Sequence, residues 1–391
     1  MQISNLQIFR YFLYLGIAGF GGPLAIIEHM RRDLVYEKKW ITIDEFKSFF
    51  GFSQICPGPL AFQFALYFSY FKKGLWAAIL AGIGLVLPSF IFVLLFSVFY
   101  KEFRDVNYVA WALYGISPVI IAIIFFSGYN LSRNVFHNDV FQYVLFFAAI
   151  AVSIFVKLHI LLLIASFAVI ALIYYVSNRE MKKGKINSSS MLLFVGGIVL
   201  VLKDFSGVIL NFFGNLNSKL LDIVYVFMKA GGLTYGSGFV IIGVLREDVV
   251  ENFHWLTSKE FLDGIAFGQI TPGPVVITST FIGYMVSGFS GSLLATVSVF
   301  LPSFILVILV AQIINKIKDN FYLQSALKGA NAAAIGAIIT VAYYLADDAV
   351  IDYWTFGLFL LAGAVLFTTK LRPYYLIIFA AVAGIVLKLF S

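Results

Sequence analysis

The sequence predicts an all-α polytopic membrane protein, in which two homologous helical halves form an inverted-topology repeat. Composition, an internal repeat and the loop charges together predict this class. Apolar residues make up 61% of the chain and charged residues 12%, against about 45–50% and 25% in soluble domains. Several apolar stretches are each near the roughly 20 residues that cross a bilayer, namely 74–100, 108–129, 140–156 and 160–176.

The internal repeat is most visible in the tripeptide Pro-Gly-Pro, which occurs at 57–59 and again 215 positions later, at 272–274. The same offset pairs identical residues elsewhere, among them Gly16 with Gly231, Arg31 with Arg246, Trp40 with Trp255 and Gln54 with Gln269. After one deleted residue, Leu87-Pro88-Ser89-Phe90 matches Leu301-Pro302-Ser303-Phe304. Chance does not maintain such a register, so the chain contains a duplicated unit. In a membrane protein a duplication usually indicates a transporter with its site between the halves.

The repeat divides the chain into a first unit at 1–180, a linker with an unpaired apolar segment at 181–214, and a second, inverted unit at 215–391. Each unit begins with an apolar helix, at about 6–30 in the first, that is interrupted by Phe20-Gly21-Gly22-Pro23 or by Tyr235-Gly236-Ser237-Gly238. A charged loop follows. Four longer apolar segments complete the unit, and the stretch 191–214 is either an interfacial linker or a crossing helix.

A capping box starts the next helix, with Thr42 and Glu45 in the first unit and Thr257 and Glu260 in the second. The helix stops at Pro-Gly-Pro. The piece at 42–56 is about 22 Å long at 1.5 Å per residue, too short for roughly 30 Å of hydrocarbon. Each break therefore lies either in one broken crossing or in a re-entrant hairpin, and the loop charges favour the hairpin.

Loop charges predict the orientation of the two units. The loop at 31–39 carries a net charge of +2 and its counterpart at 246–254 carries −2, so the positive-inside rule places the units in opposite orientations. The linker is expected to be cytoplasmic because it is basic, with Arg179, Lys182, Lys183 and Lys185. Cytoplasmic loops also account for the net charge of +7 better than a nucleic-acid partner does.

The two Pro-Gly-Pro breaks are the sharpest candidates for a binding site. Proline interrupts the helical hydrogen bonds, and glycine permits close approach of a ligand or another backbone. Pro59 and Pro274 suit the first position of the following helix, whose free N–H groups attract anions. Proline kinks without a binding role are the alternative, although two copies in matching places argue against it. The second pair of breaks allows either substrate binding or close helix packing.

Polar residues near the breaks add further candidates. Gln54 and Gln269 can donate to an oxyanion or cap a loose carbonyl. Arg31 and Arg246 suit bidentate oxyanion recognition, or serve as headgroup-level loop residues. Glu28 is a proton-coupling candidate or an interfacial residue. The predicted substrate-binding residues are Gly21, Gly22, Gln54, Pro57, Gly58, Pro59, Gly236, Ser237, Gln269, Pro272, Gly273, Pro274, Arg31 and Arg246.

Several classes of function are excluded by what the sequence lacks. One cysteine, Cys56, and four scattered histidines make neither a disulfide framework nor a metal cluster. The chain shows no paired catalytic acids or nucleophile–base constellation, and no nucleotide-binding motif. An enzyme, a cofactor, a metal and an ATP-driven pump are therefore not expected.

At these residues the chain resembles the chromate ion transporter family, in its long, two-domain form. The matching marks are Phe20-Gly21-Gly22-Pro23, Trp40-Ile41-Thr42 with Glu45-Phe46, the Gln-x-x-Pro-Gly-Pro of both halves, and Leu-Pro-Ser. The resemblance covers most of the chain apart from the linker, and the second half departs from it at Tyr235-Gly236-Ser237-Gly238.

The resemblance implies a secondary transporter in the cytoplasmic membrane of a prokaryote. It would export chromate, driven by the proton gradient or the membrane potential. Sulfate is a near-isosteric dianion, so the substrate is chromate or a similar tetrahedral oxyanion. An anion channel for small oxyanions is the alternative, because it shares the helix-end chemistry. Lipid is the other expected partner, and a homodimer is left open.

Overall fold

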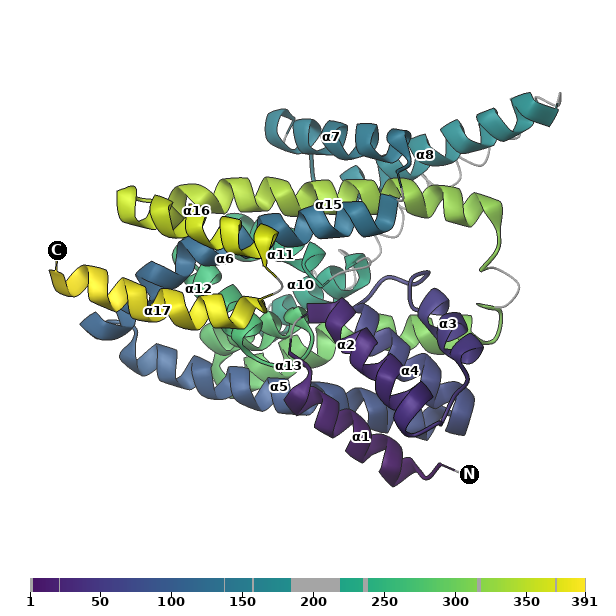
Figure 1. Cartoon of the computed structure of the whole chain (residues 1–391), viewed down its shortest axis with the longest axis horizontal. Coiled ribbons are helices and arrows are strands. Elements are labelled where there is room, and N and C mark those ends of the chain that lie inside the picture. The colour runs from purple at the N-terminus through teal and green to yellow at the C-terminus, as the bar shows by residue number, and fades with distance from the viewer. Residues whose placement is uncertain are drawn as a thin grey trace.

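The computed structural model describes residues 3–20, 22–136, 138–156, 158–183, 219–234, 238–314, 318–369 and 371–390. Within these ranges every regular element is a helix (Figure 1), as the composition predicts. The apolar segment at 191–214 and the linker residue Lys185 lie outside the described residues.

The first half contains nine helical elements within the described ranges. They are α1 (Asn5–Ala18), α2 (Gly22–Arg31), η1 (Arg32–Glu37), α3 (Ile43–Phe52), α4 (Leu60–Lys73), α5 (Leu75–Phe103), α6 (Asn107–Phe136), α7 (Val140–Phe155) and α8 (Ile160–Lys183). The predicted interruption of the first helix is the gap between α1 and α2.

The second half repeats this order. Its elements are α10 (Lys219–Leu233), α11 (Val240–Arg246), η2 (Glu247–Asn252), α12 (Ser258–Ile270), η3 (Val275–Ile277), α13 (Thr278–Ala311), α15 (Phe321–Ala349), α16 (Tyr353–Thr368) and α17 (Pro373–Phe390). Helix α13 corresponds to α4 and α5 together, because Ser287 and Gly288 interrupt its helical geometry where Gly74 separates those two helices.

Both capping boxes are confirmed. The Thr42 hydroxyl accepts from the Glu45 N–H at 3.2 Å, and the Glu45 carboxylate accepts from the Thr42 N–H at 2.9 Å. Thr257 and Glu260 repeat both bonds at the same distances. These caps satisfy two of the N–H groups that a helix start leaves without partners.

Unusual backbone geometry recurs in the same register. The short π-helices η1 and η2 are offset by 215 residues, and so are Lys39 and His254, which have φ values of 53° and 50°. Gly74 and Gly288 have φ values of 80° and 61° at the offset of 214. A left-handed backbone is uncommon for residues other than glycine. Its recurrence at matched positions therefore reflects one local fold, present twice.

Six helices within the described residues are long and apolar enough to cross a membrane. They are Leu75–Phe103, Asn107–Phe136, Ile160–Arg179, Val275–Ala311, Phe321–Ala349 and Pro373–Phe390. The predicted stretch at 140–156 forms the 16-residue helix α7, which is about 24 Å long and shorter than a perpendicular span. Helix α16 has the same length.

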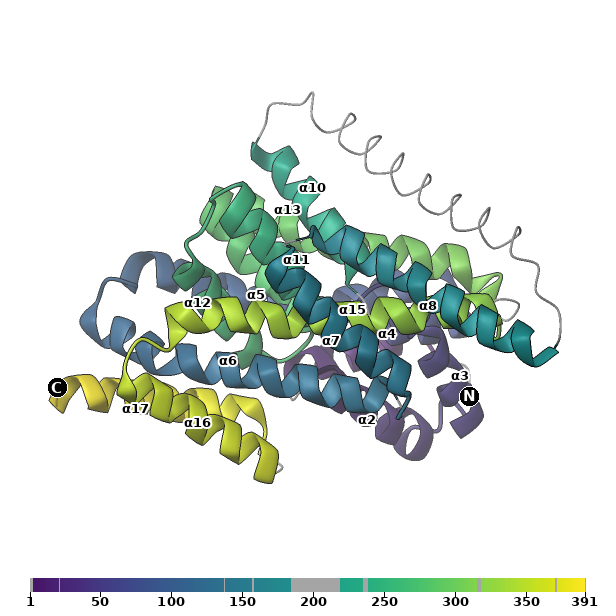
Figure 2. The same ribbon diagram turned by 90° about the horizontal axis from the view of Figure 1, so that it is seen from above.

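Corresponding helices of the two halves make corresponding contacts, some within their own half and some with the other half. Within each half, α1 packs on α5 and α10 packs on α13. Between the halves, α6 packs on α16 and α17, while α15 packs on α7 and α8. Helices α6 and α15 lie side by side in Figures 1 and 2, and α5 packs against α13. The final helices of each half thus cover the other half, and the two units share one core.

Candidate functional site

Each Pro-Gly-Pro segment is a break between two helices. The first separates α3 from α4, and the second separates α12 from η3 and α13. Gly58 and Gly273 have φ values of 142° and 108°. Side chains other than hydrogen strain this region of backbone space, so the turn itself requires glycine at both positions.

The glycine N–H of each break donates to a carbonyl of the opposite half. The Gly58 N–H donates to the carbonyl oxygen of Thr234, just after α10, and the Gly273 N–H donates to that of Gly19, just after α1, at 3.1 Å. Gly19 and Thr234 are themselves matched at the offset of 215. The carbonyl left free by the first broken helix of one half therefore satisfies the Pro-Gly-Pro turn of the other half.

A buried serine reinforces each of these contacts. The Ser89 hydroxyl on α5 donates to the Pro272 carbonyl at 2.5 Å, and the Ser303 hydroxyl on α13 donates to the Pro57 carbonyl at 3.3 Å. Both serine side chains are fully buried. Because hydrocarbon offers no hydrogen-bonding partner, a broken backbone at membrane depth is tolerated only where protein groups or a water-filled cavity satisfy it.

The breaks are also closely packed. A Cβ atom added at Gly58 would lie 1.8 Å from the Ser303 hydroxyl and 2.5 Å from the Gln63 amide nitrogen. At Gly273 it would lie 2.1 Å from the Ser89 hydroxyl. Real Cβ atoms do not approach other heavy atoms so closely. Space as well as backbone conformation therefore demands glycine at the centre of each motif.

The helix starts after the breaks have no side-chain cap. Pro59 and Pro274 occupy the N-cap positions of α4 and η3, with extended backbone, and neither offers a side-chain acceptor. The side chains of the following residues, Leu60–Phe62 and 275–277, are buried. The first N–H groups of such a helix start, together with its dipole, favour an anion.

Buried amide and hydroxyl groups lie beside the breaks. The Gln63 side chain is fully buried and donates to the Cys56 carbonyl at 3.0 Å, while its own Oε1 finds no hydrogen-bond partner among the described residues. The buried Nε2 of Gln269 is likewise without a partner there. An unpaired buried donor costs about 1–3 kcal/mol. A bound anion would remove this cost by accepting a hydrogen bond from the Gln269 Nε2–H. Its counterpart Gln54 is exposed.

Both predicted arginines form ion pairs with nearby carboxylates. Arg31 forms a bidentate pair with Glu28, whose side chain is 59% exposed, with a shortest distance of 2.6 Å. Arg246 pairs with Glu251 and lies 5.2 Å from the centre of the Tyr344 ring. The hydrogen bonds that join the breaks across the halves come from neutral groups instead. Gly22 begins α2, whereas Gly21, Gly236 and Ser237 lie outside the described residues.

Sequence reasoning missed the partners of the breaks. Ser89 and Ser303 were recognised only as parts of a repeated Leu-Pro-Ser motif, and Gly19, Thr234 and Gln63 were not singled out. The repeat register contained a usable signal, because a serine retained at matched positions of two diverged apolar helices requires a polar reason. It did not identify the acceptor, which belongs to the other half.

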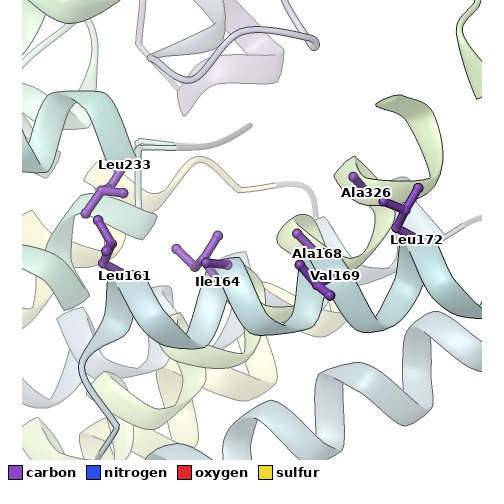
Figure 3. A pocket seen from close by; sticks show the side chains of 8 residues that line it. Leu161, Ile164, Ala168, Val169, Leu172, Leu233 and Ala326 are labelled. Atoms are coloured by element: carbon purple, nitrogen blue, oxygen red, sulfur yellow. The ribbon is translucent and has the colours of Figure 1, made fainter. Parts of the chain in front are cut away.

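A separate cavity of about 270 Å³ is lined by apolar side chains of α8, α10 and α15 (Figure 3). Its lining residues are Leu161, Ile164, Ala165, Ala168, Val169, Leu172, Leu233 and Ala326. A dianion would lose its hydration there without gaining hydrogen bonds, so this cavity is not the anion site. No group of three or more metal-ligating side chains is found in the part of the chain that the structure describes.

These observations define the class of protein as a multi-pass, all-helical membrane protein in which paired broken helices are joined across two repeated halves. A family model for chromate transporters matches residues 6–174 and again residues 221–385. The chain therefore belongs to the chromate transporter family, and both of its halves match one model. It is a protein of the prokaryotic plasma membrane.

Curated relatives match over nearly the whole chain. A chromate transport protein of Cupriavidus metallidurans is 34% identical over 97% of this chain and 92% of its own length. A probable chromate transport protein of Synechococcus elongatus is 33% identical over 98% and 95%. An uncharacterized transporter of Methanocaldococcus jannaschii is 29% identical over 86% and 83%. No solved structure matches the chain.

Proposed function

We propose that this protein is a secondary active transporter that exports chromate, or a similar tetrahedral oxyanion such as sulfate, across the cytoplasmic membrane. The observation that carries the proposal is the reciprocal pair of contacts at the breaks. The Gly58 N–H bonds Thr234 and the Gly273 N–H bonds Gly19, in a chain whose relatives include chromate transport proteins. Broken helices that meet between repeats are where secondary transporters hold their substrates.

The repeat is proposed to be inverted, with a pseudo-two-fold axis in the membrane plane. Support comes from the opposite charges of the segments at 31–39 and 246–254, expected as loops but largely formed by the π-helices η1 and η2. The exchanged packing of α6 with α17 and of α15 with α8 adds to it. A two-fold operation generates reciprocal contacts of this kind. In such a design the two halves rock against each other around a fixed site.

The anion is proposed to bind at the uncapped starts of α4 and η3, with the Gln269 amide as a further donor. Oriented N–H dipoles hold a dianion without a cationic side chain, because several hydrogen bonds replace the water shell. Neutral recognition also favours release, since binding must be weak enough for the anion to leave. Arg31 and Arg246 would then act outside the site, at the ends of α2 and α11.

The test is flux into proteoliposomes that contain the purified full chain, with labelled chromate and sulfate as separate substrates. We expect saturable chromate flux that responds to an imposed pH gradient or membrane potential. Flux that never saturates and is uncoupled from any ion would identify the alternative, an anion channel. Chromate flux no greater than in protein-free liposomes would contradict the proposal.

A further inference from the structure

Helix α12, which ends at the second break, carries a buried acid. The Asp263 side chain is 2% exposed, and its Oδ2 accepts a hydrogen bond from the Tyr100 hydroxyl on α5 at 2.9 Å. The bond joins the two halves of the protein. A buried carboxylate normally has a cationic partner, whereas here the hydrogen-bond donor is a neutral hydroxyl.

Aromatic rings surround this pair. The Tyr100 ring lies edge-on to Phe267 and Phe281, with ring centroids 5.7 Å and 5.2 Å away. Phe96 stacks on Phe267 at 5.4 Å. Such surroundings solvate a charge poorly, so they favour the neutral acid and make the ionised form dependent on its one hydroxyl donor.

The neighbouring charges do not neutralise the carboxylate. Arg104, which caps the C-terminal end of α5, is engaged by Glu260 in a close ion pair, and Lys259 on α12 is exposed. Besides Tyr100, these three are the groups that act most strongly on Asp263. Helices α6, α13, α15 and α17 also pack on α12. No titratable group in their described parts acts on the Asp263 carboxyl more strongly than these three.

The first half has no equivalent of this pair. Position 263 corresponds to Ser48, whose hydroxyl donates to the Asp44 carbonyl of its own helix at 2.9 Å. Tyr100 corresponds to Ile314, which is fully buried and apolar. The two breaks therefore share their backbone contacts, but at matched positions only the second has a buried carboxylic acid bonded across the halves.

Helix α5 contacts both the acid and the break. Its Ser89 binds the Pro272 carbonyl and its Tyr100 binds Asp263, about 16 Å apart along the helix at 1.5 Å per residue. A change in the charge of Asp263 alters one of these two contacts between α5 and the second half, the hydrogen bond to Tyr100. It thereby changes how firmly α12 and its break are held against the first half.

We propose that Asp263 is the proton-binding group that couples transport to the proton gradient, with Tyr100 as its positioning residue. The inference rests on the proposed function. One proton binds the Asp263 carboxylate and neutralises it, and the same proton leaves on the opposite side of the membrane after the halves have rearranged. Glu28, the acid expected from the sequence, is exposed and paired with Arg31, and so lacks this environment.

The decisive variant is Asp263→Asn, assayed in proteoliposomes with labelled chromate. Coupling of ordinary size changes affinity about 5- to 150-fold. We therefore expect the KM of the wild type for chromate to change with pH within that range. In Asp263→Asn the KM becomes independent of pH and a pH gradient no longer drives accumulation. Exchange of external for internal chromate continues, because it requires no net proton movement.

Tyr100→Phe supplies a second readout that keeps the ring and removes only the hydroxyl. Loss of a hydrogen bond to the ionised carboxylate raises the pH at which transport is half-maximal, by about 1 unit. Asp44→Asn is the matched control, because Asp44 is an exposed acid of α3, the helix that corresponds to α12. It keeps the wild-type pH profile.

The outcomes separate the two proposals. Coupled transport in Asp263→Asn with a wild-type pH profile overturns the inference and leaves the proposed function intact. A flat profile in Glu28→Gln, together with a normal one in Asp263→Asn, assigns coupling to Glu28 and also overturns it. If Asp263→Asn loses exchange as well, the Tyr100→Phe midpoint decides, and an unshifted midpoint overturns the inference. Absence of chromate flux in the wild type contradicts the proposed function itself.

Discussion

The two Pro-Gly-Pro breaks have the same backbone contacts but different side-chain attachments. Before the first break, Glu45 of α3 pairs with Lys72 of α4 at 2.7 Å, within one half. Before the second, Glu260 of α12 pairs with Arg104 of α5, which belongs to the other half. The reciprocal backbone bonds are thus the common requirement of the duplicated fold. The side chains have diverged, so that an ion pair across the halves accompanies the second break, whereas the matched ion pair at the first break stays within one half.

The glycine at the centre of each break offers the largest test of their equivalence. Gly58→Val and Gly273→Val introduce a branched side chain where φ is positive and where a Cβ would meet a serine hydroxyl. We expect either change to abolish chromate flux while the protein still inserts. Flux is measured in proteoliposomes at expression matched to the wild type.

Gly357→Val in α16 is the control, because a Cβ there meets nothing within 4 Å. Substitution of each glycine by alanine compares how strongly the two breaks depend on glycine. Gly58→Ala is expected to lower chromate flux more, because its Cβ approaches Gln63 as well as Ser303. Wild-type flux in both valine variants would show that the breaks are structural kinks and that the site lies elsewhere.

The two capping glutamates test whether attachment across the halves matters. Glu45→Gln and Glu260→Gln both preserve a capping box, since glutamine also serves at that position, and each removes one ion pair. Partly exposed pairs contribute about 1 kcal/mol or less, so similar small losses of thermal stability are expected. Only Glu260→Gln should lower the transport rate, by a few-fold, because only its pair joins the halves.

The stability that the Glu45–Lys72 and Glu260–Arg104 pairs contribute is expected to depend on pH in the same way. Burial raises the pKa of Glu45, but the Lys72 ammonium and the Thr42 backbone outweigh it and hold the pKa below its usual value. For Glu260 the Thr257 cap and Arg104 do the same. The stability from each is therefore present above the unfolded carboxyl pKa, about 4.3, and is lost as pH falls through the folded value.

Equal losses of transport rate in Glu45→Gln and Glu260→Gln would remove the proposed difference between the two breaks.

The buried serines should give a smaller effect. Ser89→Ala and Ser303→Ala each remove one hydrogen bond between the halves, which typically contributes about 0.5–1.5 kcal/mol. We expect a few-fold loss of initial transport rate in each variant, because each hydroxyl donates to a carbonyl of the opposite break. Ser97→Ala is the control, because that hydroxyl donates to Val93 within α5 itself. A larger loss in the control than in Ser89→Ala would contradict the role given to the hydroxyl.

Arg31→Gln is expected to have the smallest effect. Its guanidinium is exposed and paired with Glu28, so removing it disturbs neither break, and the KM for chromate should change little. Arg246→Gln is the matched comparison, since Arg246 is more deeply placed and lies against Tyr344. A 10-fold or greater rise in KM for Arg31→Gln, about 1.4 kcal/mol of binding free energy, would show that the Arg31 guanidinium contributes to substrate binding.

Much of the fold could be predicted because it depends on short-range patterns. Hydropathy predicted the long helices α5, α6 and α8, and the Thr-x-x-Glu pattern predicted both capping boxes. Such features depend on residues within a few positions of one another, which the sequence displays directly. The stretch at 140–156 was predicted to within one residue of α7. Its apolarity did not tell that the helix, at 16 residues, is shorter than a perpendicular span.

The two breaks in the helices were predictable from the sequence, but their hydrogen-bond partners were not. The repeat located both Pro-Gly-Pro breaks, yet arginine chemistry suggested Arg31 and Arg246, which the structure pairs with Glu28 and Glu251. A local carboxylate at i−3 or i+5 competes effectively for a guanidinium. That competition depends on the rotamers and burial of both partners, which spacing along the chain does not reveal.

By itself the sequence determined the membrane class, the duplicated unit and the two glycines that make the breaks possible. Each follows from composition or from register, which are properties of neighbouring or repeated positions. Only the tertiary structure decided that Thr234 and Gly19 accept from those glycines, that Ser89 and Ser303 cross to the opposite half, and that Asp263 meets Tyr100. These partners are far apart in sequence, and they come together because each half leaves backbone groups that lipid cannot satisfy and the other half can.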